Sequence, residues 1–247
     1  MARTFETGHA KNVANLGELL AILNSFGAAY NPSKKSIIIT ALQNLQAMAV
    51  NVLDEVSSAL PAYSNAVAAR DAAFAPMNKL VTRIVNAIKA TDTTEQVDDN
   101  ARSLARKIQG RRTSPKMSEE EKKSAADEGK DIIEISASQT SFDSRLENFS
   151  KLIKLLASIP LYAPNEPELK VESLTGLYND LKKLHGDVTV AAVPLTKARI
   201  ARNVVLYAKD TGLVDTTVDV KNYVKSLYGA TSPQYRQVSK LAFTSVK

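Results

Sequence analysis

The chain of 247 residues contains no cysteine and no tryptophan, and only two histidines, His9 and His185. Without cysteine the chain has no disulfide framework, thiol nucleophile, Cys-ligated zinc or iron–sulfur cluster. Two histidines that lie far apart in the sequence leave little for a histidine-based metal site or catalytic triad. We therefore predict no metal, no cofactor and no small-molecule ligand.

Long hydrophobic runs are also missing. The longest, such as residues 188–195, are far shorter than the ~20 residues that span a bilayer. The N-terminus lacks the apolar stretch of a secretory signal, which predicts a cytoplasmic protein.

Motifs that carry catalysis are absent as well. There is no phosphate-binding loop, dinucleotide fingerprint, nucleophile elbow or zinc-protease helix in the sequence. A di-iron bundle needs Glu-x-x-His pairs, but residues 182–185 read Lys-Lys-Leu-His. His185 precedes Gly186, which is typical of a helix C-terminus. We predict that the protein is not an enzyme and has no catalytic residues.

Basic residues are concentrated in one short segment. The net charge is +6, and the acid-free segment 102–116 carries six cations: Arg102, Arg106, Lys107, Arg111, Arg112 and Lys116. Three glutamates follow at 119–121, a pattern typical of a solvated loop. The alternative is an anion- or nucleic-acid-binding surface, helped by Arg236, Lys240 and Lys247 in the basic tail.

Apolar residues recur at spacings of three and four almost everywhere, which predicts an all-α protein. Val13 to Phe26 form one stripe, which Gly27 ends, and another runs from Val97 to Gly110, a C′ glycine. Pro61 is predicted to interrupt or restart a helix, and Pro76 to kink or break one near Phe74.

The two halves of the chain resemble each other. Each has a short helix, a Tyr-x-Pro turn (Tyr30 and Tyr162), two long helices and a shorter helix that ends at glycine. We predict two pseudo-repeated four-helix units packed as a roughly eight-helix bundle. The domains would be residues 1–110, a polar linker at 111–140 with a possible short helix, and residues 141–247 with the basic tail.

Each Tyr-x-Pro element is predicted to be a structural corner, with a buried ring and a hydroxyl that bonds to nearby backbone. Arg70 and Arg202 occupy matching places on apolar seams. Each is predicted to lie along the core with its head at the edge or paired with an Asp or Glu. The alternative is that these buried polar positions form an anion-binding or register-setting site between the two repeats.

Several stretches resemble a family of bacterial proteins of similar length found in the Bacteroidota. They include the opening Met-Ala-Arg-Thr-Phe-Glu-Thr-Gly-His, Ser138 to Phe149, Leu161 to Leu169 and Tyr223 to Tyr235. The resemblance covers nearly the whole chain. It implies a bacterial origin and a helical fold, and carries no activity or cofactor.

Three classes of function remain. The first is a structural or protein-interaction protein, including one that assembles with itself. The alternative is nucleic-acid binding through 102–116, and a less favoured one is an α-helical pore former.

Overall fold

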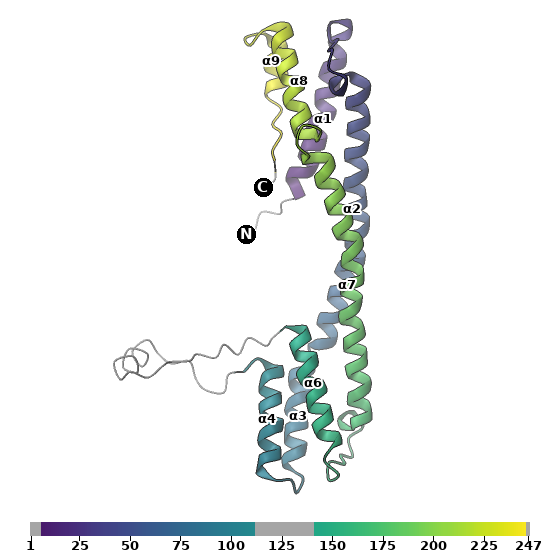
Figure 1. Cartoon of the computed structure of the whole chain (residues 1–247), viewed down its shortest axis with the longest axis vertical. Coiled ribbons are helices and arrows are strands. Elements are labelled where there is room, and N and C mark those ends of the chain that lie inside the picture. The colour runs from purple at the N-terminus through teal and green to yellow at the C-terminus, as the bar shows by residue number, and fades with distance from the viewer. Residues whose placement is uncertain (1–5, 112–140, 246–247) are drawn as a thin grey trace, which may run out of the picture. The chain divides into compact units, whose positions relative to one another are not determined.

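The computed structural model describes residues 6–111 and 141–245, and within these ranges the chain is helical, with no strand (Figure 1). The all-α prediction is confirmed. The helices are α1 (Glu6–Ser25), α2 (Ile39–Phe74), α3 (Met77–Lys89), α4 (Glu95–Gln109), α6 (Phe142–Ala157), α7 (Val171–Tyr207), α8 (Leu213–Tyr228) and α9 (Pro233–Ser239). Short 3-10 turns precede the two long helices at Lys35–Ile37 and Pro167–Leu169. None of the helices in these ranges is long and apolar enough to cross a membrane.

The chain folds into two compact units. Unit 1 contains residues 1–64 and 190–247, and unit 2 contains residues 65–189. This division differs from the predicted domains 1–110 and 141–247, because each unit draws on both halves. The cause is the length of α2 and α7, 36 and 37 residues, since each helix carries the chain from one unit into the other.

The core of unit 1 forms where α1 packs on α8 and α9 (Figure 1). The predicted α1 stripe is buried here, together with apolar residues of α2 and the last turns of α7. Its most deeply buried members are Leu16, Leu19, Leu23, Leu42, Ala49, Leu206, Leu213, Val220, Val224 and Val238.

The core of unit 2 forms where α4 packs on α3 and on α6 (Figure 1). Its members follow the helical spacing seen in the sequence, so each helix buries one apolar stripe. The most deeply buried are Phe74, Met77, Val81, Ile84, Ile88, Ala101, Ile108, Phe149, Leu152, Leu156, Leu174 and Leu181.

The prolines act as predicted in one place and differently in another. The break near Phe74 is confirmed, because α2 ends there and Pro76 caps α3. The prediction that Pro61 interrupts a helix is wrong: α2 runs through it, and α7 likewise runs through Pro194. An interior proline removes one backbone hydrogen bond, and the packed turns on both sides keep these helices continuous.

Two further expectations concern helix ends. Gly110 follows α4 with a φ of 66°, and its N–H donates to the carbonyls of Arg106 and Lys107, which confirms the C′ glycine. His185 is not at a helix end, because it lies inside α7. A Cβ at Gly186 would meet nothing within 4 Å, so this glycine reflects no tight turn or close contact. The predicted polar linker lies outside the described residues, apart from Arg111.

Candidate functional site

The basic segment lines a groove in unit 2. Arg102 and Arg106 lie one turn apart on α4, Arg111 follows that helix, and Lys89 reaches the groove from α3. The groove has a volume of about 300 Å³. Neutral side chains complete the lining, and no acidic side chain of a described residue is among them: Thr82, Val85, Asn86, Ala105 and Gln109.

Of the six predicted cations, the structure describes four, and these four face different neighbours. Arg102 pairs with Asp99 at 2.5 Å, and Arg106 and Arg111 join it in the groove. The charge of Lys107 instead acts on Glu147 of α6. The pKa of Glu147 is lowered first by a hydrogen bond from Lys151 and its charge, and further by the charge of Lys107. Arg112 and Lys116 lie outside the described residues.

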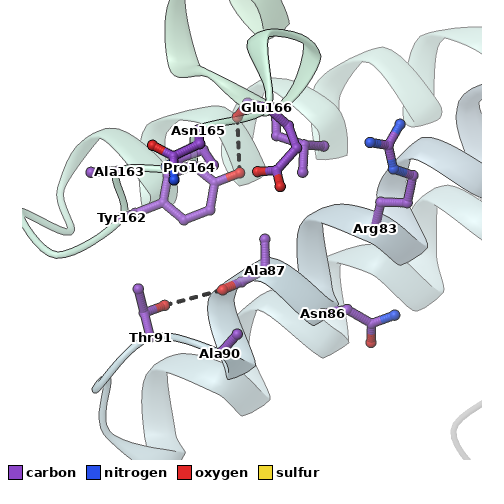
Figure 2. Close-up of a pocket in the computed structure, with 11 residues that line it drawn as sticks. Arg83, Asn86, Ala87, Ala90, Thr91, Tyr162, Ala163, Pro164, Asn165 and Glu166 are labelled. Carbon is purple, nitrogen blue, oxygen red and sulfur yellow. Dashed lines mark hydrogen bonds between the residues drawn. The ribbon is translucent and has the colours of Figure 1, made fainter.

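A second hollow lies beside the Tyr162 corner, between the end of α3 and the turn before α7 (Figure 2). It has a volume of about 460 Å³. The Tyr162 hydroxyl donates to the carbonyl of Leu169 at 2.9 Å, and Arg83 pairs with Glu168 at 2.7 Å. Burial raises the pKa of Tyr162, and the charge of Glu166 raises it further. The Tyr162 hydroxyl and the Arg83 guanidinium each already have a partner, which supports a structural corner.

The other Tyr-x-Pro turn has the same geometry in unit 1. The Tyr30 hydroxyl donates to the carbonyl of Ile37 at 2.7 Å, and burial, followed by the nearby Tyr223, raises the pKa of Tyr30. The acceptor is seven residues after the tyrosine in both turns. Both rings are buried.

The paired arginines also match. The Arg70 side chain is 14% exposed, and its Nε and Nη2 donate to Asp71 at 3.0 and 2.9 Å. The Nε and Nη2 of Arg202 donate to Asn203 at 3.2 and 3.0 Å. Each guanidinium therefore makes two hydrogen bonds to the side chain of the next residue. The Arg70 guanidinium carbon also lies 3.8 Å from the centroid of the Phe142 ring.

Sequence reasoning did not foresee the group around His185. Its Nε2 lies 3.0 Å from Asp143, and its ring lies 5.9 Å from that of Phe142. A cavity of about 600 Å³ beside this pair is lined by α6 and α7 side chains, among them Lys151 and Lys182. Within the described ranges no group of three metal-ligating side chains forms. Only the fold brings the pair together, because 42 residues separate its members.

An exposed apolar stripe runs along the unit 1 part of α7. Val190, Val193, Ile200 and Val204 are 72%, 64%, 60% and 59% exposed. With Lys197 they follow a strict three–four spacing, the period of a coiled-coil seam. We call these four apolar residues the α7 stripe. The opposite face of α7 is already buried at Leu195, Ala198 and Leu206, so this helix is apolar on both sides.

Fold and site together define an all-α protein with a basic groove in one unit and an apolar helix face in the other. No family model, curated protein or solved structure matches the chain.

Proposed function

We propose that the protein is a non-enzymatic structural protein that works through protein–protein contacts, and that its partner at the α7 stripe is a second copy of itself. The observation that carries this proposal is the stripe. Four exposed apolar side chains that gather on one face of a helix mark a contact surface, and a seam with heptad spacing fits another helix of the same spacing. The same helix of a second copy offers that spacing.

The strength of this contact follows from the free energy gained by burying the stripe against the cost of association. Burying an exposed valine or isoleucine gives about 1–2 kcal/mol at these exposures, so eight such side chains in a symmetric pair give about 8–16 kcal/mol. Association costs about 4–15 kcal/mol. A gain near the middle of its range, about 12 kcal/mol, less a cost of about 4–8 kcal/mol leaves about 4–8 kcal/mol. This surplus corresponds to dissociation constants between about 1 µM and 1 mM.

Sedimentation equilibrium from about 10 µM to 1 mM tests this self-association. The wild type should shift from monomer to dimer, and a variant with Val193→Lys and Ile200→Lys should stay monomeric. The matched control carries Val50→Lys and Val218→Lys, which are also exposed but lie outside the stripe. A wild type that is monomeric at 1 mM, or a control that dissociates as fully as the stripe variant, would contradict the proposal.

An internal repeat is the second part of this proposal. The two tyrosine corners and the two arginine forks support it, as does the order of the elements: helix, corner, proline-containing long helix, then two shorter helices. Pro61 and Pro194 lie 22 and 23 residues after the first residues of their helices, Ile39 and Val171. A crystal structure should superpose residues 12–110 on residues 145–239 element by element, with α9 matching α4. A different helix order would contradict the repeat.

A second candidate function is nucleic-acid binding in the α3–α4 groove. Three arginines and Lys89 line it without an acid among the described lining residues, and arginines bind phosphate through fixed pairs of donors. None of the described residues that line the groove is aromatic, so these residues offer bases no stacking partner and their contacts go to the phosphates.

Fluorescence anisotropy with a single-stranded oligonucleotide at varied salt tests this candidate. Three or four neutralised phosphates predict a log–log salt slope of about −2 to −3. Arg102→Gln with Arg106→Gln should weaken binding, whereas Lys182→Gln with Lys183→Gln removes the same charge elsewhere and should not. Equal losses in both variants, or no binding at about 50 mM salt, would refute it.

A further inference from the structure

In each compact unit, a helix from one half of the chain packs on one or more helices from the other half. In unit 1, α1 belongs to the N-terminal half (residues 1–111), and it packs on α8 and α9 of the C-terminal half (residues 141–247). In unit 2, α6 of the C-terminal half packs on α4 of the N-terminal half. The first described helix of each half, α1 or α6, therefore packs on the last described helices of the other half, α8 and α9 or α4.

The unit 1 contact is specific as well as apolar. The buried Asn12 amide donates to the carbonyl of Thr244 at 2.8 Å and accepts from its N–H at 3.0 Å. Asn15, also buried, donates to the carbonyl of Ala242 at 2.6 Å. These bonds join residues more than 220 positions apart. They satisfy buried amides that would otherwise be left without partners.

The unit 2 contact is mainly apolar. Phe149, Leu152 and Leu156 of α6 are at most 1% exposed, and they share one core with Ile108 of α4 and Ile84 of α3. Without α6, α3 and α4 would present this apolar surface to water. Without α3 and α4, α6 would do the same.

Neither half contains a complete unit. The segment 6–64 of the N-terminal half lies in unit 1, while its segment 65–111 lies in unit 2. The C-terminal half is divided in the same way at residues 189 and 190. The halves therefore depend on each other for both cores, and outside residues 112–140 only non-covalent contacts join them.

We propose that the surface joining the two halves is also a self-assembly interface, and that its partner there is the complementary half of a second copy. In a second copy, α1 of one chain would lie on α8 and α9 of the other, and α4 of one on α6 of the other. Every contact would be the same as within one chain. The covalent connection gives the internal pairing an effective concentration on the order of mM, so exchange between copies needs a comparable concentration or a cut connection.

This inference goes beyond the self-association proposed above and uses a different surface, so the two can fail separately. The test uses the full chain with a protease recognition sequence inserted between residues 125 and 126. The folded protein is cut and then measured by native mass spectrometry and size exclusion. The two fragments should stay together as a one-to-one pair with the mass of the uncut protein.

The partner from a second copy is tested by mixing. Cut protein labelled with ¹⁵N is incubated with unlabelled cut protein, and pairs with one labelled fragment should accumulate toward the statistical proportion. The stripe variant, Val193→Lys with Ile200→Lys, should exchange as fast as the wild type, because the stripe is not part of this interface. If the protease does not cut the folded chain, co-expression of 1–125, tagged, with 126–247, untagged, replaces the cut.

Two results would overturn the proposal. One is a pair of cut fragments that separate into folded species, or a tagged fragment that purifies folded and alone. The other is a cut pair that never forms mixed pairs with labelled protein, even after reversible unfolding and refolding together.

Discussion

Replacing the corner tyrosines by phenylalanine removes one hydroxyl and leaves the ring in place. In Tyr162→Phe the carbonyl of Leu169 loses its donor, and in Tyr30→Phe the carbonyl of Ile37 does. Both accepting residues are buried. A net hydrogen bond is worth about 0.5–1.5 kcal/mol, and a buried acceptor without a partner costs about 1–3 kcal/mol. We expect each variant to lose about 1–2 kcal/mol of unfolding free energy.

Urea unfolding followed by circular dichroism measures this loss as a midpoint lower by about 0.5–1 M. Tyr63→Phe is the matched control, because this partly buried ring makes no hydroxyl hydrogen bond to a described residue in the structure, and it should leave the midpoint unchanged. A large loss in one corner and none in the other would refute the equivalence of the two corners. Losses no larger than the control's in both would refute their structural role.

Three further predictions follow from single contacts. Arg70→Met should lower the unfolding free energy by only about 1 kcal/mol in urea melts, because Asp71 is exposed and is not left as an unpaired charge in the core. Arg202→Met should lower it by a similar amount. A loss of about 3–5 kcal/mol at either position would indicate a buried ion pair instead. Burial raises the pKa of Tyr162 above its unfolded value near 10, so its contribution to the unfolding free energy should be constant below pH ~10 and fall above it. In an absorbance titration, which the absence of tryptophan keeps clean, part of the tyrosinate signal should therefore appear only as the fold is lost. A full signal from all eight tyrosines in folded protein would contradict this. Asn12→Ala removes both bonds to Thr244, so carboxypeptidase should trim the C-terminal segment roughly tenfold faster or more, and an unchanged rate would show that the amide does not hold it.

Local features of the fold were predictable because their causes lie within a few residues. Proline restricts the residue before it, so the Tyr30 and Tyr162 corners followed from sequence, and the hydroxyl bonds have the expected kind of acceptor. The role of Gly110 at the end of a helix was predictable from its place just after the last apolar residue of the stripe. The prediction that Pro61 interrupts a helix failed because a helix can continue through proline when the turns on both sides are packed. That packing depends on distant residues and cannot be seen from the proline alone.

The pairing of distant elements was not predictable in the same way. Helical periodicity shows that α1 and α6 each have an apolar face, but it does not say which helices cover them. The sequence therefore suggested domains 1–110 and 141–247, whereas the compact units take parts of both.

The candidate sites were predictable in part. Arg102, Arg106 and Arg111 stood out as a cluster, but Lys89 joins them only through the α3–α4 packing. The spacing of Val190, Val193, Ile200 and Val204 was present in the sequence, yet which face of α7 the core buries depends on tertiary contacts. The same holds for the pairing of His185 with Asp143.

Each compact unit takes residues from both halves of the chain, and carbodiimide cross-linking of the unmodified protein tests this pairing directly in unit 1. The Lys34 ammonium donates to the Asp219 carboxylate, 185 positions away, within unit 1. A zero-length reagent should join these two side chains in the monomer, and mass spectrometry of the digest should recover the peptide pair that contains them. Recovery of cross-links only within 1–110 and within 141–247 would contradict the claim.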